Sequence, residues 1–384
     1  MNISPNIVFV DSQTELSSLI EVLTNLDDKG VIALDTEFMR VSTYYPVFAL
    51  LQLNINGISY LLDPISMDLS KLIERLNKTE ATVLIFASLE DLEVISHYAR
   101  EHNISPLLPK KIVDLQLLAA FLNLSYSQGL SKSISLYLGT ELPKNATRSD
   151  WEQRPLSPEQ LSYASDDVFY LKELYDVYMS KALKNDIRVR WFYKAMEDFK
   201  LQCIKEVDVD EIYLNLQGAG ALTNLQLQRL SYLAKKRENY AKENNIALSR
   251  IAPSKSLVAI CVSTPLTFQG LAGCGVKWGA IHHYGKMLIG WIKETLDFKG
   301  DPTLKTPYDS VVSTRHGSKQ YKRLKFILNS RAERAAIRSE LLLTKSLCYD
   351  YLFNKKIGQK ALLEGSWYYE CVGEIDYKDL SSEA

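Results

Sequence analysis

Residues 31–38 read VIALDTEF, an apolar run that ends in two acidic residues. The composition of the run predicts a β-strand, and Asp35 and Glu37 stand two residues apart at its end. Because side chains alternate along a strand, both carboxylates leave the same face of the sheet. A D-x-E pair is also common where a strand simply runs into solvent. Here the apolar residues before the pair and Phe38 and Met39 after it predict a buried sheet edge, where unpaired carboxylates would be costly without a cation.

Short β-rich runs alternate with amphipathic stretches around this segment. The strand-like runs lie at 6–10, 31–38, 49–55, 58–63 and 82–86, and the helical patterns lie at 14–25, 88–101, 115–122 and 157–180. Only Asn56 and Gly57 separate the third run from the fourth, and this dipeptide predicts a tight hairpin. The first half of the chain is therefore expected to be an α/β domain with a mixed sheet.

From about residue 181 the β-rich runs stop, and the sequence predicts helices alone. The helical patterns lie at 184–204, 222–243, 255–262, 266–271, 279–293, 319–328 and 331–354. The polar joint KEVDVDE at 205–211 and the Pro-containing segment DPTLKTPYDS at 301–310 read as linkers. We expect an α/β domain at 1–205, a helical domain at 206–299, and a second helical unit at 300–384 that ends in a disordered acidic tail.

Composition excludes several classes of protein. The chain is 46% hydrophobic and 24% charged, as ordinary globular proteins are. Its apolar runs are far shorter than the roughly 18 residues that a membrane span needs, and the N-terminus lacks a leader pattern. The five Cys form no C-x-x-C pair and no zinc-finger spacing, so reduced thiols are expected. These features predict a cytoplasmic protein, and we expect a monomer.

The charge of the chain is strongly asymmetric. The formal net charge is −1, but residues 1–180 hold 24 acidic and 13 basic side chains, whereas residues 181–384 hold 22 acidic and 32 basic ones. The two halves therefore carry −11 and +10. A basic half can indicate contact with nucleic acid, and a solvated basic face is the other interpretation.

Two further segments offer carboxylates at helix starts. In FASLEDLEVI, Ser88 and Asp91 have the spacing of a capping box, so Asp91 could be a capping residue alone. In SPEQLSYASDDVFYL, Ser157, Pro158 and Gln160 predict a helix start, and the four-residue spacing of Tyr163 and Asp167 puts both side chains on one helical face. Taken alone, a Tyr-x-x-x-Asp pattern is weak, because any amphipathic helix can contain it.

Together, a strand and two helices of one domain contribute four carboxylates and a tyrosine. Oxygen ligands without His or Cys suit Mg²⁺ or Mn²⁺ better than zinc. Two such ions about 3.5–4 Å apart are a recurring solution for phosphodiester hydrolysis. The sequence therefore favours cleavage of a phosphate ester.

Several segments, in order over about residues 5–300, resemble ribonuclease D. They are DTEFMR and TYYPVFALLQL, SLEDLEVI, VDLQLLAAFL, RSDWEQRPLSPEQLSYASDDVFYL, and YLNLQGAGALTNLQLQRLSYLAKKRE. The resemblance implies a DEDD-superfamily 3′→5′ exonuclease with a ribonuclease H-like fold, here at 1–205. It also implies an HRDC domain at 206–299 and, more loosely, a second, divergent HRDC-like domain at 300–384. Tyr163 implies the tyrosine branch, since Ser162 stands where the histidine branch has its His. The chain contains no phosphate-binding G-x-x-x-x-G-K-[ST] loop, which argues against a helicase.

The resemblance also implies roles for single residues. Asp35 would bridge two metal ions, Glu37 and Asp167 would complete the ligands of the ion that activates water, and Asp91 would serve the second ion through water. Tyr163 would orient the attacking water. Phe86 stands five residues before Asp91, where many relatives have a polar His, and this departure removes no ligand.

A single-stranded 3′ end also needs a basic track, which the acidic residues 1–180 are not expected to supply. The candidate RNA-binding residues are Lys235, Lys236, Arg237, Lys322, Arg323 and Lys325. We expect a 3′→5′ exoribonuclease that trims tRNA precursors and releases nucleoside 5′-monophosphates. A DNA 3′→5′ exonuclease, or a catalytically silent RNA-binding adaptor on the same scaffold, are the alternatives.

Overall fold

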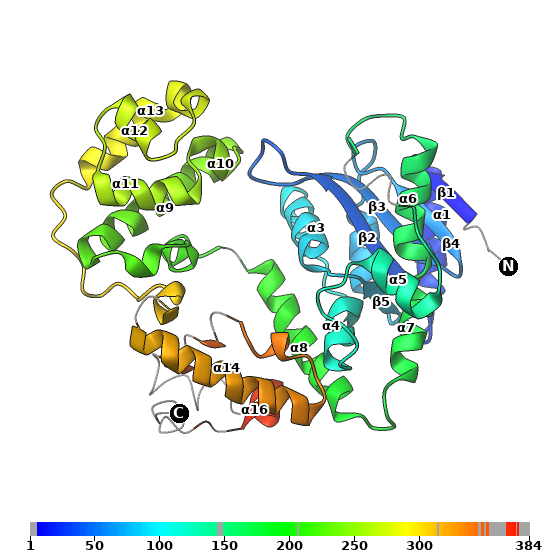
Figure 1. Cartoon of the computed structure of the whole chain (residues 1–384). Helices are drawn as coiled ribbons and strands as arrows, with labels where there is room; N and C mark the ends of the chain where they lie inside the picture. Colours follow the sequence, from blue (N-terminus) through cyan, green and yellow to red (C-terminus); the bar gives the residue numbers. More distant parts are fainter. Residues whose placement is uncertain are drawn as a thin grey trace. The chain divides into compact units, whose positions relative to one another are not determined.

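The computed structural model describes residues 6–143, 149–205, 207–312, 315–344, 347–348, 351–352, 366–373 and 375. The chain forms two compact units (Figure 1). The sheet unit contains the described residues within 1–39, 46–205 and 332–341, and the helical unit contains those within 40–45, 206–331 and 342–384. The two units divide near residue 205, and the division into three domains at 1–205, 206–299 and 300–384 stays a prediction.

The sheet unit is built on a mixed six-stranded sheet. Its strands are β1 (Asn6–Val10), β2 (Val31–Met39), β3 (Val47–Ile55), β4 (Ile58–Leu62), β5 (Thr82–Ile85) and β6 (Lys111–Asp114). They lie in the order β1-β4-β3-β2-β5-β6. The β2–β3 and β3–β4 pairs are antiparallel, and the other pairs are parallel. The predicted mixed sheet is therefore confirmed.

Two local features set the register of the central strands. Asn56 and Gly57 join β3 to β4 with φ values of 52° and 81°, which is the positive-φ geometry of the predicted tight hairpin. The β2–β3 register shifts between Glu37 and Phe38. Such bulges re-aim side chains, and this one directly follows the acidic end of VIALDTEF.

Helices cover both faces of the sheet (Figure 1). They are α1 (Gln13–Thr24), α2 (Ser70–Asn77), α3 (Leu89–Glu101), α4 (Leu115–Phe121), α5 (Leu130–Leu138), α6 (Pro158–Phe169), α7 (Leu171–Ser180) and α8 (Ile187–Ile204). Helix α6 packs over β2, β3 and β4, and α3 packs against β2 and β3. Since Asp35 and Thr36 alternate on β2, the strand presents one side chain toward each of these helices.

The helical unit has its own core. It contains η1 (Ile212–Asn215), η2 (Ala219–Ala221), α9 (Asn224–Asn244), α10 (Leu248–Ile251), α11 (Ser254–Ser263), α12 (Phe268–Gly273), α13 (Trp278–Glu294), η3 (Tyr308–Val312) and α16 (Trp367–Val372). Helix α14 (Arg315–Ala335) begins in this unit, and η4 (Ser339–Leu341) belongs to the sheet unit. Leu230, Leu233, Leu257 and Ile260 are among the buried residues that pack α9 against α11. No helix of the described residues is both long and apolar enough to span a bilayer.

Some predicted elements differ from the structure. The expected helix at 157–180 is two helices that meet at Tyr170, and the sequence reading missed α2, α5 and β6. Two separate helices were expected at 319–328 and 331–354, and this prediction is wrong. One continuous helix, α14, covers the first range and the start of the second, and it ends before Ala336, whose φ is 51°. The predicted disordered tail lies largely outside the described residues.

Candidate active site

The structure brings three of the predicted carboxylates together. Oxygen atoms of Asp35 and Glu37 on β2 and of Asp167 on α6 all lie within 4.8 Å of one another. The two strand residues share a face because they stand at i and i+2, and α6 covers that face. The side chains are partly buried and form a compact set of oxygen donors.

Helix α6 starts where the sequence predicts, and a capping box stabilises its first turn. The Ser157 hydroxyl accepts from the Gln160 backbone N–H at 3.2 Å, and the Ser157 N–H donates to Gln160 Oε1 at 2.9 Å. This capping box satisfies two donors of the helix start. Tyr163 lies on α6 one turn before Asp167. The hydrogen bond between the two side chains acts to lower the pKa of Asp167. The capping box thus fixes where α6 begins, and the packing of α6 on β2, β3 and β4 places both motif residues over the sheet.

The loop before α6 supports Tyr163 from the side. The ring of Trp151 lies 6.1 Å from that of Tyr163, within an apolar cluster that includes Leu50 and Leu61. Arg154 anchors this loop: its Nε and Nη2 donate to the two carboxylate oxygens of Asp63 at 2.7 and 2.8 Å. The same guanidinium donates to the carbonyl oxygens of Ala49 and Trp151, both at 2.7 Å. The tyrosine is thus held by packing and by a charged anchor.

Asp91 lies at the start of α3, but it does not cap that helix. The Ser88 side chain makes no capping hydrogen bond, and its hydroxyl donates instead to Asp114 at 2.8 Å. Asp91 Oδ1 accepts from the Thr36 backbone N–H at 3.0 Å and from the Thr36 hydroxyl at 2.5 Å. The capping interpretation of Asp91 is therefore wrong, and the residue is tied to β2 directly beside Asp35.

Burial and mutual repulsion dominate the electrostatics of this carboxylate cluster. Burial, followed by the charges of Asp91, Asp167 and Glu37, raises the pKa of Asp35 well above its ordinary value. Burial, then Asp167 and Asp91, raises the pKa of Glu37 to about 8. Burial is also the largest cause of the pKa of about 7 at Asp167 and of about 6 at Asp91. All four acids therefore resist ionisation in this cluster. A bound cation would stabilise their charged forms.

The donor set matches a hard divalent cation. All of its members are carboxylates, and no His or Cys belongs to the group of close ligand atoms found among the described residues. Oxygen donors of this kind favour Mg²⁺ or Mn²⁺ over the softer transition metals.

A cavity of about 350 Å³ adjoins Tyr163 and Asp167 of the site. Tyr163, Asp166 and Asp167 line one side, and the start of α5 lines another with Gly129, Leu130, Ser131 and Lys132. This volume lies in the range of small-ligand pockets. Helix α5 was not predicted from the sequence. Two features could have indicated it: the four-residue spacing of the apolar Leu130 and Ile134, and Gly139 directly after the helix.

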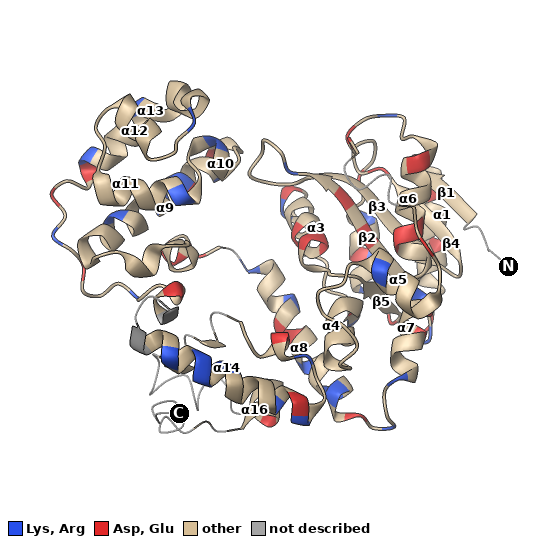
Figure 2. Cartoon of the chain, viewed as in Figure 1, with Lys and Arg blue, Asp and Glu red and all other residues tan. Residues whose placement is uncertain are grey.

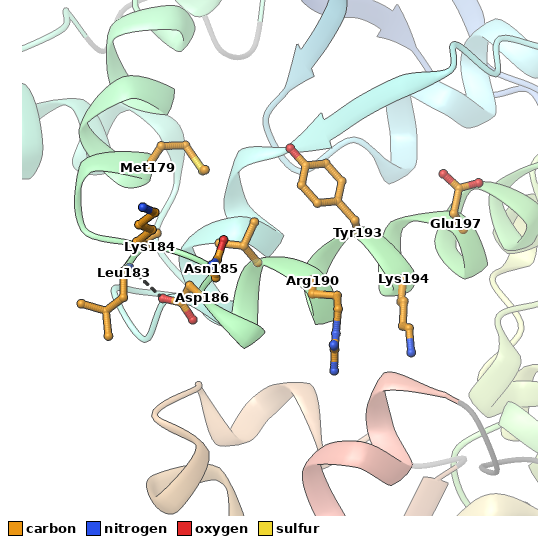
Figure 3. Close-up of a pocket in the computed structure, with 11 residues that line it drawn as sticks. Met179, Leu183, Lys184, Asn185, Asp186, Arg190, Tyr193, Lys194 and Glu197 are labelled. Atoms are coloured by element: carbon orange, nitrogen blue, oxygen red, sulfur yellow. Dashed lines mark hydrogen bonds between the residues drawn. The ribbon is translucent and has the colours of Figure 1, made fainter.

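A larger groove of about 860 Å³ lies on the same unit, away from the carboxylates. It lies between the end of α7 and α8, and its lining includes Leu183, Lys184, Arg190, Tyr193 and Lys194. Figure 3 shows Arg190 and Lys194 projecting to the same side of α8. The sheet unit extends to residue 205, beyond the acidic segment 1–180. Helix α8 therefore adds basic side chains such as Arg190 and Lys194 to this unit.

The predicted RNA-binding residues divide into three groups. Arg237 is 1% exposed and donates to the carbonyl oxygen of Ala252 at 2.7 Å, so its guanidinium serves the core and is not a surface phosphate contact. Lys235 and Lys236 are partly buried on α9 and form ion pairs with Asp210 and Glu294. On α14, Lys322 and Lys325 are exposed and Arg323 lies over the Phe326 ring at 5.7 Å. Figure 2 shows basic residues recurring along both helices.

Comparisons with known families identify both parts of the chain. A 3′-5′ exonuclease family model matches residues 7–184, and an HRDC domain model matches residues 226–292. The fold and the site together thus define a 3′→5′ exonuclease joined to an HRDC domain.

Individual relatives narrow this class. Ribonuclease D of Haemophilus influenzae is 34% identical over 282 residues, which cover 72% of this chain and 68% of the relative. Ribonuclease D of Shewanella sp. is 29% identical over 368 residues, 94% of this chain and 90% of the relative. The crystal structure of Escherichia coli RNase D superposes with a TM-score of 0.79 at 26% identity, covering 98% of this chain and 99% of that one. The chain belongs to the ribonuclease D family of 3′→5′ exoribonucleases, and exonucleases of this acidic type depend on metal ions.

Proposed function

We propose that this chain removes nucleotides from the 3′ ends of tRNA precursors by a two-metal hydrolysis and releases nucleoside 5′-monophosphates. The observation that carries the proposal is the convergence of Asp35, Glu37 and Asp167 within 4.8 Å, next to Asp91. Among the described residues no Lys or Arg forms an ion pair with these carboxylates, and two Mg²⁺ or Mn²⁺ ions would neutralise them.

The four carboxylates would hold the ions, with Asp35 shared between them. Bound divalent ions supply Lewis-acid activation of the attacking water and stabilise the charge that develops on the leaving 3′-oxygen. Tyr163, held beside Asp167 by its hydrogen bond and by Trp151, orients the attacking water. The cavity beside α5 accepts the terminal nucleotide and limits water around the scissile phosphate.

The RNA body is proposed to bind to basic surfaces. Lys322, Arg323 and Lys325 on α14, with Lys235 and Lys236 on α9, offer cations to phosphates. The α8 groove adds Arg190 and Lys194 from the sheet unit. Contacts of this type position a strand and read no sequence. We propose that the chain acts on RNA as a monomer.

Two alternatives predict different activities. A DNA 3′→5′ exonuclease would use the same carboxylates, and its preference would depend on contacts to the sugar 2′-position. A silent RNA-binding adaptor would bind RNA without cleavage, which the complete set of motif residues disfavours. The family membership favours RNA hydrolysis over both.

The test compares matched substrates. Purified protein is incubated with a 3′-extended tRNA precursor, with the same sequence as DNA, and with a precursor whose 3′ end is base-paired. We expect stepwise shortening of the extended RNA to the mature end, with little cleavage of DNA and of the paired end. Equal or faster hydrolysis of the DNA would contradict the proposed RNA specificity, and binding without cleavage would favour the adaptor.

A further inference from the structure

Gln52 is a buried polar residue that the proposed mechanism does not use. It lies in the middle of β3, its side chain is 0% exposed, and neither Nε2 nor Oε1 has a hydrogen-bond partner among the described residues. Burying an amide without any partner is unfavourable, and such groups in folded proteins call for an explanation. A packing role does not provide one, because an apolar side chain of the same size would pack at no such cost.

The register of the sheet places one polar residue directly opposite Gln52. Gln52 pairs with Asp35 on β2 and with Leu61 on β4. Side chains of directly opposed residues leave the same face, with Cβ atoms about 4.5–5.5 Å apart. In this row across three strands, Leu61 is apolar and belongs to the cluster beneath α6. The carboxamide therefore stands between an apolar residue and the carboxylate that the proposed function places at the centre of the metal site.

We propose that Gln52 is a positioning residue for the metal site, whose Nε2–H donates to the carboxylate of Asp35 when that carboxylate holds a divalent cation. The proposal rests on the metal site of the proposed function. An ionised carboxylate offers about four lone-pair positions, so an oxygen that ligates a cation can still accept a hydrogen bond. Groups that hydrogen-bond to metal ligands fix their orientation, and their loss typically lowers metal affinity 10–100-fold.

Asn54 provides a matched control on the same strand. It is two residues from Gln52, faces the same side of the sheet, is 7% exposed, and pairs with the apolar Ala33 on β2. Its Nδ2 donates to the Ser59 hydroxyl at 3.0 Å, within the β3–β4 hairpin. Asn54 thus has a structural partner, whereas Gln52 faces the metal site.

The experiment measures Mn²⁺ binding to the metal-free full-length protein by isothermal titration calorimetry, together with the melting temperature and without RNA. For Gln52→Met, we expect Mn²⁺ affinity to fall 10–100-fold while the metal-free melting temperature is unchanged or higher. For Asn54→Leu, we expect a lower melting temperature with unchanged Mn²⁺ affinity. If Gln52→Met fails to fold, Gln52→Leu answers the same question with a smaller side chain.

The outcomes separate this inference from the proposed function. If the wild type binds Mn²⁺ and Gln52→Met binds it equally well, Gln52 has no positioning role and the inference is overturned. A lower melting temperature for Gln52→Met with unchanged affinity would overturn it as well, because that pattern marks a structural amide satisfied by buried water. If the wild type itself binds no Mn²⁺, the proposed metal site fails and the role of Gln52 fails with it.

Discussion

Thr36 and Asp91 are joined by two hydrogen bonds, since the backbone N–H and the hydroxyl of Thr36 both donate to Asp91 Oδ1, at 3.0 and 2.5 Å. Thr36 lies between Asp35 and Glu37 on β2, whereas Asp91 belongs to α3. One residue of the D-T-E segment therefore fixes the fourth carboxylate of the site. This link explains why a helix 55 residues further along the chain presents its acid to the same strand.

Removal of the Thr36 hydroxyl should weaken the site without removing a ligand. We expect Thr36→Val to lower the rate of RNA hydrolysis about 10–100-fold, because Asp91 loses one of the donors that orient it. Thr36→Ser keeps the hydroxyl and should retain most of the activity. Initial rates over a Mg²⁺ titration measure both variants. Activity of Thr36→Val at the wild-type level would show that this hydrogen bond does not matter for the site.

The stability of the metal-free protein should fall as the pH rises from about 4 toward 8. The pKa values of Glu37, Asp91 and Asp167 are raised in the folded state, to about 8, 6 and 7. The folded protein therefore binds more protons than the unfolded chain in this window, and its free energy of unfolding decreases with pH. Mn²⁺ should restore the stability lost at high pH, as thermal melts from pH 5 to 8.5 would show.

Asp167→Asn provides the control for this pH dependence. The amide has nearly the same shape and no charge, so the metal-free variant should be more stable than the wild type at pH 8.5, by about 1 kcal/mol or more. Its dependence on pH should be shallower, and Mn²⁺ should stabilise it less. A variant with the same profile as the wild type would show that the carboxylate cluster does not govern the pH dependence.

Breaking the anchor between Arg154 and Asp63 should destabilise the loop that supports Tyr163. The Asp63 carboxylate is 5% exposed, so Arg154→Met leaves a buried acid without its partner. We expect a loss of about 3 kcal/mol in the free energy of unfolding, measured by urea denaturation. The exposed pair Lys110–Glu80 serves as comparison, since Lys110→Met should cost less than about 1 kcal/mol. Equal costs for the two variants would contradict the anchoring role.

Charge reversal on α14 should weaken RNA binding in a salt-dependent way. If Lys322 and Lys325 both contact phosphates, the double variant Lys322→Glu/Lys325→Glu should reduce the slope of log affinity against log salt concentration by about 1.4, two contacts at 0.7 each. Lys71→Glu/Lys78→Glu makes the same change in charge on two exposed lysines, one in α2 and one directly after it, and should leave the slope unchanged. Fluorescence anisotropy with labelled RNA in EDTA measures binding alone. Identical slopes for the two double variants would remove α14 from the proposed RNA-binding surface.

Local rules explain which elements were predictable from the sequence. VIALDTEF, the Asn56–Gly57 hairpin and the helix start at Ser157 depend on residues within a few positions of one another, and all three are confirmed. The short edge strand β6 carries little pattern of its own and depends on pairing with β5. Sequence analysis missed it for that reason.

The candidate site, too, was predictable only where it depends on residues close together in the sequence. Alternation along β2 was enough to place Asp35 and Glu37 together, and helical spacing placed Tyr163 above Asp167. The contact between Thr36 and Asp91 depends on how α3 packs on the sheet, and the burial of Arg237 depends on the fold of the helical unit. Neither is encoded in local spacing, which is why Asp91 was open to a capping interpretation and Arg237 was grouped with surface lysines.

The most direct test of the account measures the products from a 3′-end-labelled single-stranded RNA, in the presence of Mg²⁺ or Mn²⁺ and in the presence of EDTA. The two-metal account predicts that wild-type protein releases the label as a nucleoside 5′-monophosphate with either ion and releases none in EDTA. It also predicts that Asp35→Asn, which removes the proposed shared ligand, releases none under any condition. Cleavage that survives EDTA or Asp35→Asn, or release of the label in oligonucleotides, would contradict the account.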